Sequence, residues 1–144
     1  MIAAKGSVSA RAELAGHEDL EPEFLYFFAQ DKDPKVRRAV AENDGSPLQA
    51  DLILAQDQLP SIRIIIADEI KHLDNIPKRI IKRLARDAEE AVAGPILEYS
   101  PLLNDEQLMQ IVTSGLRGGA LEAVARRHNL AAEIAEAVVA QDED

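Results

Sequence analysis

The chain has 144 residues, 47% of them hydrophobic but only 3% aromatic, and a formal net charge of −10. This length suggests one domain over residues 1–144, and the abundance of Ala, Leu, Glu and Arg favours helix over sheet. The lack of cysteine excludes disulfides and thiolate metal sites, and the negative charge argues against general affinity for nucleic acid or anionic membranes.

The first sixteen residues, MIAAKGSVSARAELAG, contain one lysine and an apolar run that is too short for a signal peptide. No later segment approaches the roughly 20 consecutive apolar residues that a membrane-crossing helix needs. We therefore expect a cytoplasmic protein without a membrane segment.

A polar sequence motif typical of a turn recurs along the chain. DKDPKVR at Asp31–Arg37 is followed 26 residues later by DQLPSIR at Asp57–Arg63, and a weaker copy begins at Asp87. An alanine stands two residues before each Asp, and an aliphatic residue stands five residues after it. These positions are Ala29, Ala55 and Ala85, and Val36, Ile62 and Val92. Fainter copies at Val112 and Val139–Asp142 extend a period of about 28 residues.

Prolines follow the same period and predict where helices begin. Ser46-Pro47 and Ser100-Pro101 each have the pattern of an N-cap followed by a first turn, and Pro34 and Pro60 open the helices after the polar turns. Each unit then contains two short helices, which cannot bury their apolar faces without neighbours. The predicted units span roughly 7–31, 32–57, 58–87, 88–114 and 115–144.

Two segments test this helical interpretation. SIRIIIADEI is rich in β-branched residues, as a strand would be, but Leu59, Ile62, Ile66 and Ile70 recur at steps of three and four and predict a helix. In AVAGPILEYS, Pro95 lies in mid-helix and should remove a backbone hydrogen bond and kink the helix.

The pattern D-x-D-P-x-V-R resembles the junction of HEAT-like repeats, and Asp31–Arg37 matches it fully. The resemblance implies an all-α, right-handed α-solenoid of about four to five short HEAT-like helical hairpins. It also implies a polar ladder of Asp and Arg side chains between neighbouring units. Its candidate members are Asp31, Arg37, Asp57, Arg63 and Asp87. Ala93 replaces the expected Arg in the third copy, so we expect the ladder to break there.

A narrower resemblance is to a bacterial domain family of unknown function with HEAT-like units. It depends on RAELA (11–15), VAGPILEYSPLLNDEQL (92–108) and AVARRHNL (123–130). The chain is similar to the front part of a longer family member, and the resemblance supplies no catalytic residues.

No motif for catalysis or for a cofactor is present in the sequence. It lacks the P-loop, dinucleotide, zinc-protease and nucleophile-elbow patterns. His17, His72 and His128 lie far apart and lack the spacing of metal ligands, and Gly118-Gly119 is typical of a loop rather than of a phosphate site. We predict no enzyme activity, no cofactor and no metal.

One segment, PKRIIKRLARD, reverses the sign of charge in this acidic chain. Its five cationic residues recur at helical spacing, opposite Ile80, Ile81 and Leu84. This is the pattern of the solvent-exposed face of an amphipathic helix. The five residues are Lys78, Arg79, Lys82, Arg83 and Arg86. The same stripe suits an acidic peptide, a phosphate or a nucleic-acid backbone.

The repeat places other side chains in register with this stripe. Lys82 and Arg83 align with Leu52 and Ile53 of the preceding unit, and these align with Tyr26 and Phe27. In HEAT-like solenoids such positions line the concave face, so an aromatic, aliphatic and basic surface would suit an apolar helix with an acidic end. Alternatively, these four apolar side chains, Tyr26, Phe27, Leu52 and Ile53, pack between units.

We therefore expect a non-catalytic adapter or scaffold that binds a partner protein, with nucleic-acid or phosphate binding through the Lys78–Arg86 stripe as the alternative. A lyase that acts on a chromophore-bearing protein is a distant third. Exposed Ile134, Val138 and Val139 on the last helix would also favour self-association. The sequence identifies neither the partner nor the pathway.

Overall fold

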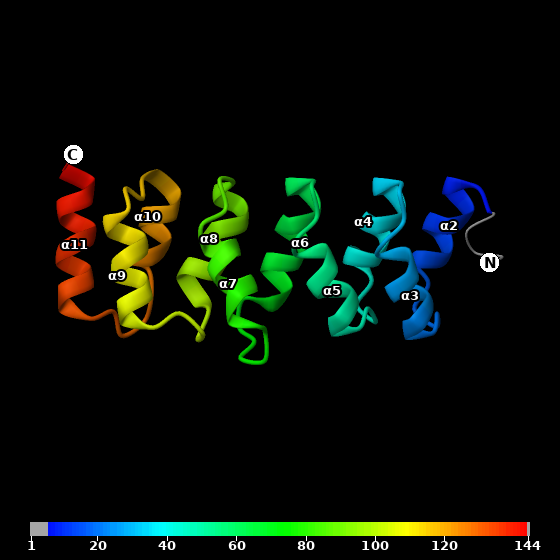
Figure 1. Ribbon diagram of the computed structural model, residues 1–144, viewed down its shortest axis with the longest axis horizontal. Helices are drawn as coiled ribbons and strands as arrows, with labels where there is room; N and C mark the ends of the chain where they lie inside the picture. Colours follow the sequence, from blue (N-terminus) through cyan, green and yellow to red (C-terminus); the bar gives the residue numbers. More distant parts are fainter. Residues whose placement is uncertain (1–5, 144) are drawn as a thin grey trace. The chain divides into compact units, whose positions relative to one another are not determined.

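The computed structural model describes residues 6–143 of the chain. Residues 1–5, which open the segment predicted not to be a signal peptide, and residue 144, which ends the last predicted unit, lie outside this range. The described residues form ten α-helices and no strands, which confirms the all-α prediction (Figure 1). The helices are α2 (Val8–Ala15), α3 (Pro22–Phe28), α4 (Pro34–Glu42), α5 (Leu48–Leu54), α6 (Pro60–Ile70), α7 (Lys78–Ala85), α8 (Glu90–Tyr99), α9 (Asp105–Thr113), α10 (Gly118–Ala125) and α11 (Ala132–Glu143).

The prolines after the polar turns begin helices as predicted. Pro34 is the first residue of α4, and the carboxylate of Asp33 before it accepts a hydrogen bond from the backbone N–H of Lys35 at 2.9 Å. Pro60 is likewise the first residue of α6. A proline fits there because its missing N–H would have no partner in the first turn.

The two predicted Ser-Pro starts are wrong. Pro47, rather than Ser46, is the N-cap of α5, so this helix begins one residue later than expected. Ser100 ends α8, and Pro101 lies in the following turn. The next helix instead starts after Asn104, which forms a reciprocal capping box with Gln107. These two hydrogen bonds satisfy two of the backbone donors at the start of α9. Leu103, three residues after Ser100, has no polar side chain that could complete such a box.

The ambiguous segment SIRIIIADEI is helical, as predicted. Ile62, Ile66 and Ile70 of α6 are buried, whereas Leu59 precedes the helix and is partly exposed. The helix α8 continues through Pro95 as one element. Gly94 before the proline lacks the Cβ that would clash with the proline ring, which explains why the helical conformation persists there.

The alanines that mark the repeat are buried where the helices end. Ala29 and Ala55 are the C-caps of α3 and α5, and Ala85 is the last residue of α7. A small residue lets the chain turn closely against its neighbours at these points. Ala140 differs: it lies inside α11 and is exposed, so the last copy of the pattern is not structurally equivalent.

The chain divides into two compact units, residues 1–66 and residues 67–144, with the boundary inside α6. In the first unit, α2 packs on α4 and α3 packs on α5, while α3 also contacts α2 and α4 (Figure 1). The core between them contains Leu25, Phe28, Val36, Val40 and Leu54.

In the second unit, α7 packs on α8, α8 on α10, and α9 on α11, and α10 also contacts α11 (Figure 1). Its core contains Ile81, Leu84, Ile96, Leu97 and Val124. Each unit therefore contains helices that pack on the next helix but one along the chain. No helix among residues 6–143 is both long and apolar enough to cross a membrane.

A partly buried carboxyl group lies at the start of α5 in the first unit. Burial raises the pKa of Asp51 to about 6, and the nearby Ser46 hydroxyl only partly opposes this rise. Within the described residues, neither Ser46 Oγ nor Asp51 Oδ1 has a hydrogen-bond partner of normal geometry. The ionised form of Asp51 is therefore poorly solvated in the folded chain.

We expect Asp51→Asn to stabilise the fold at neutral pH. An unfolded Asp ionises near pH 4, so the contribution of Asp51 to wild-type stability falls as the pH rises from about 4 through about 6 and is constant beyond. In a fully buried Asp, a pKa raised by this much would correspond to a loss of about 3 kcal/mol in stability at neutral pH. Because Asp51 is partly accessible to water, we expect Asp51→Asn to recover only about 1 kcal/mol. Thermal unfolding at pH 7.5 and pH 3.5 checks this: equal melting temperatures at pH 7.5 would contradict it.

Candidate functional site

The repeated polar turn is built from a set of hydrogen bonds within the first unit. Asp31 Oδ1 accepts from the backbone N–H of Asp33 at 2.9 Å, and Arg37 Nη1 donates to the carbonyl of Asp31 at 2.8 Å. In the second copy, Asp57 Oδ1 accepts from the N–H of Leu59, and Arg63 Nη1 donates to the carbonyl of Asp57 at 2.7 Å. The Asp and Arg of the motif thus close the same turn twice.

Arg37 also reaches the next turn along the chain. Arg37 Nε lies 2.7 Å from Asp57 Oδ2, and Arg37 Nη2 lies 3.3 Å from Asp57 Oδ1, so the pair is bidentate. Only 16% of the arginine side chain and 5% of the aspartate side chain are exposed. A paired, largely dehydrated guanidinium of this kind holds two turns together.

Arg11, which the sequence analysis did not assign to the ladder, forms the same pair with Asp31. The distances are 2.9 Å from Nε to Oδ2 and 3.2 Å from Nη2 to Oδ1. Burial alone would raise the pKa of Asp31, but the hydrogen bonds from Arg11 and the Asp33 N–H outweigh it and lower that pKa. The missed signal was spacing, since Arg11 stands 26 residues before Arg37.

The third copy of the turn lies in the second unit. Asp87 Oδ1 accepts from the backbone N–H of Glu89 at 3.0 Å, as in the first two copies. Ala93, at the position of the arginine, is buried and cannot form an ion pair. The link between α8 and α10 therefore needs other residues.

The predicted basic stripe lies on one exposed face of α7 and its C-cap. All five cations, Lys78, Arg79, Lys82, Arg83 and Arg86, are exposed, and they occupy about 140° of the helix circumference. The opposite face buries Ile80, Ile81, Leu84 and Ala85. No carboxylate occurs between Lys78 and Arg86. We call these five residues the α7 basic face.

The apolar candidates of the predicted groove belong to the first unit. Tyr26 is 44% exposed, and Phe27 is half-buried with its ring edge-to-face against Phe28 at 5.7 Å. Leu52 and Ile53 on α5 are half-buried. Each pair is thus only partly covered within its own unit.

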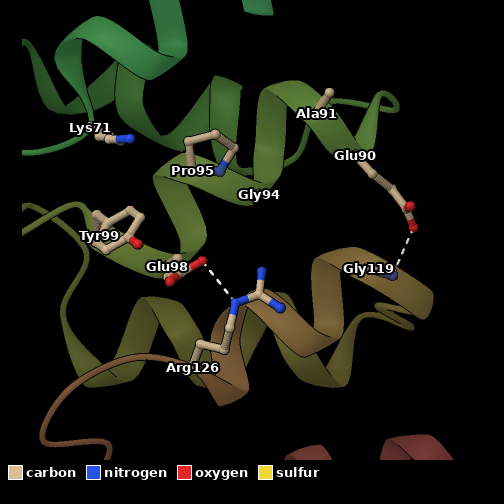
Figure 2. A pocket seen from close by; sticks show the side chains of 9 residues that line it. All are labelled: Lys71, Glu90, Ala91, Gly94, Pro95, Glu98, Tyr99, Gly119 and Arg126. Carbon is tan, nitrogen blue, oxygen red and sulfur yellow. Dashed lines mark hydrogen bonds and ion pairs between the residues drawn. The ribbon is translucent and has the colours of Figure 1, made fainter.

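A groove of about 330 Å³ lies along α8 in the second unit (Figure 2). Ala91, Gly94 and Pro95 line its middle, and a Cβ added at Gly94 would meet no atom within 4 Å. Pro95 cannot donate the usual helical hydrogen bond to the carbonyl of Ala91. None of the α7 basic face lines this groove.

The charged side chains that line the groove already have partners within the unit. Figure 2 shows Arg126 Nε joined to Glu98 Oε1, at 2.9 Å. Lys71 Nζ lies 2.8 Å from Asp68 Oδ1 and 5.1 Å from the centre of the Tyr99 ring. The Asp68 hydrogen bond raises the pKa of Lys71, and the Arg126 hydrogen bond lowers the pKa of Glu98. These charges join α8 to its neighbours.

A glutamate from α8 occupies the start of α10. Glu90 Oε2 accepts a hydrogen bond from the backbone N–H of Gly119 at 2.8 Å, which Figure 2 shows at the far end of the groove. A Cβ at Gly118 or Gly119 would lie within 3 Å of the Glu90 carboxylate and would displace it, and the φ of +59° at Gly118 favours glycine there as well. The chain's own carboxylate thus fills the place that an anion would take at this helix N-terminus.

Arg127, next to Arg126, caps the end of α8. Its Nη1 donates to the carbonyl of Leu97 at 2.7 Å and its Nη2 to the carbonyl of Ser100 at 2.9 Å. Burial lowers the pKa of Arg127, and the charge of Asp105 opposes this. A cation suits the negative end of a helix dipole. AVARRHNL and VAGPILEYSPLLNDEQL therefore contact each other.

The histidines His17 and His72 make contacts within the fold. Within residues 6–143, no three His, Asp or Glu side chains gather in a way that could hold a metal ion. His72 instead packs its ring against Tyr99, with ring centres 4.8 Å apart. His17 Nδ1 accepts from the N–H of Asp19.

Part of the chain matches a known protein family. Residues 92–144 match the model of a family described as uncharacterised protein conserved in bacteria (DUF2336). The match contains α9, α10, α11 and most of α8, and therefore the Glu98–Arg126 and Arg127 contacts. It includes two of the three motifs behind the narrower resemblance, and RAELA lies outside it. No curated protein and no solved structure matches the chain.

The α8–α10 contacts were missed from the sequence, although a signal was present. Glu98 and Arg126 are 28 residues apart, which is the average repeat period, and Glu90 and Gly119 are 29 apart. Residues one period apart lie on neighbouring equivalent helices, so opposite charges at that spacing indicate a contact.

Proposed function

We propose that the protein is a non-catalytic binding module that takes an acidic segment of a partner protein on the α7 basic face. The observation that carries this proposal is the set of five exposed cations, with no carboxylate between them, in a chain of net charge −10. Such a reversal of sign concentrates positive potential on one helix face, where it steers a negatively charged partner and fixes its position.

The net charge favours a protein segment over nucleic acid. A duplex carries a dense line of phosphates, and a ligand that long would also meet the negative surface outside α7. A short acidic segment can contact the five cations alone. The aliphatic stems of Lys and Arg give such a segment apolar contact besides the charge.

We further propose that the helices stack as HEAT-like hairpins of a right-handed α-solenoid. The packing of α2 on α4, α3 on α5, α8 on α10 and α9 on α11 supports this, as does the same Asp-closed turn at Asp31, Asp57 and Asp87. In such hairpins α3 and α5 occupy equivalent positions in the first unit. Tyr26, Phe27, Leu52 and Ile53 on these two helices would then form an apolar contact surface of that unit.

Binding of a synthetic acidic amphipathic helix, labelled with a fluorophore, tests the proposal by anisotropy. We expect Arg79→Glu with Lys82→Glu to weaken binding about tenfold or more, because two attractive charges become repulsive. The control, Lys32→Glu with Lys35→Glu, makes the same change of charge at two exposed lysines in the first unit and should leave binding nearly unchanged.

Equal loss in both variants would mean that net charge, rather than the α7 basic face, governs binding. No binding of the peptide to the wild-type protein at low salt would contradict the proposal directly. A duplex oligonucleotide that binds more tightly than the peptide, with a steep dependence on salt, would decide for the nucleic-acid alternative.

A further inference from the structure

The outer side of α11 carries an apolar strip that the described residues leave uncovered. A groove of about 610 Å³ between α10 and α11 is lined by Leu121, Ala125, Val138 and Val139 among others. A second groove, of about 440 Å³, shares Val139 and adds Ala135 and Ala140. Val139 is 58% exposed, whereas Ile134, which was predicted to be exposed with it, is buried.

The remaining lining of both grooves is acidic. Glu122, Asp142 and Glu143 border the larger groove, and Glu136 and Glu143 border the smaller one. No Lys or Arg lines either groove. The nearby Arg117 uses its Nη1 to donate to the carbonyl of Gln141. A surface that fits here must bring aliphatic groups for the apolar strip and cations for the rim.

The α7 basic face has both properties. Its lysine and arginine side chains have three or four methylene groups that can lie on an apolar strip while the charged heads reach outward to carboxylates. Arg79 and Lys82 lie near the middle of this face, 100° and 40° around the helix from Lys78, by about 100° per residue. The chain therefore carries complementary surfaces on α7 and on α10 and α11 of the same unit.

We propose that the α7 basic face of one copy docks on the α10–α11 groove of a second copy. Two other exposed apolar residues, Leu14 and Phe24, are less suited to this groove. Leu14 and Phe24 lie next to Glu13 and Glu23, and these carboxylates would repel the acidic rim. Because two different surfaces meet, a pair leaves the groove of one copy and the basic face of the other free for further contacts, so association need not stop at two copies.

This inference rests on the proposed function, because it assigns a second ligand to the same α7 basic face. Self-association would then compete with capture of an acidic partner, and an acidic peptide would dissociate the oligomer. The two proposals fail separately. Peptide binding is measured at low protein concentration, where the chain is monomeric, whereas self-association is measured without peptide.

Light scattering of the full chain over a range of concentrations tests the proposal. At low salt the average mass of the wild-type protein should rise with concentration, and high salt should reverse this. Two charge reversals separate the surfaces: Arg79→Glu with Lys82→Glu on the basic face, and Glu122→Lys with Glu143→Lys on the rim. Each variant alone should associate about tenfold more weakly or not at all.

An equimolar mixture of the two variants restores one attractive pairing, between the reversed face and the reversed rim, and should associate again. Circular dichroism of each variant shows that the helices are retained, as expected for four exposed positions. A wild-type chain that stays monomeric at every concentration would overturn the proposal. So would variants that associate like the wild type, or a mixture that does not associate.

Discussion

Replacing Arg37 with alanine should lower the free energy of unfolding by about 3 kcal/mol, because it leaves a dehydrated carboxylate without its partner. Arg37 forms the bidentate pair with Asp57 and also donates to the carbonyl of Asp31. Asp57 is only 5% exposed, so water cannot replace the lost guanidinium. Chemical denaturation of the variant and the wild type measures the difference.

The neighbouring residue supplies a matched control. Arg38 lies 3.6 Å from Glu42 in an exposed pair one turn along α4, and such pairs contribute about 0.5 kcal/mol or less. Arg38→Ala removes the same side chain from the same helix and should change stability little. If Arg37→Ala and Arg38→Ala have equal effects, the turn is not held by the buried pair. Arg37→Lys keeps the positive charge but lacks the guanidinium group that makes the bidentate contact. Its loss of stability should therefore lie between those of Arg37→Ala and Arg38→Ala.

Local chemistry made the polar turn predictable from sequence. Most of the pattern in DKDPKVR reflects local roles: Asp33 and Pro34 start the helix, Asp31 closes the turn, and Val36 is buried. The partner of Arg37 lies 20 residues away, but the family resemblance implied an Asp and Arg pairing between units. Short-range capping and helix propensity therefore account for most of the fold that was anticipated.

What the sequence did not reveal depends on how helices pack. Ser46 and Ser100 both precede proline, yet one lies just outside an N-cap and the other ends a helix, because the rest of each turn decides. The α8 groove exists because Gly94 has no side chain and because the Glu98 carboxylate is held by its hydrogen bond from Arg126. Such features need the register between α8 and α10, which no single segment encodes.

Replacing Arg127 with alanine should cost about 2–3 kcal/mol, since it leaves the carbonyls of Leu97 and Ser100 without their donor in a half-buried position. Arg126 is the control. Its side chain is 55% exposed, its pair with Glu98 lies at the surface, and Arg126→Ala should cost about 1 kcal/mol or less. The two changes remove the same group from adjacent positions, so their difference measures burial and capping.

Hydrogen exchange locates the effect of Arg127→Ala. The N–H of Ser100 bonds to the carbonyl of Ile96 in the last turn of α8, and its exchange should become faster in Arg127→Ala but not in Arg126→Ala. Faster exchange spread evenly over α8 and α10 would instead mean that the arginine holds the two helices together without capping either. Unchanged exchange at Ser100, with stability lost, would show that the cap at the end of α8 is not what Arg127 supplies.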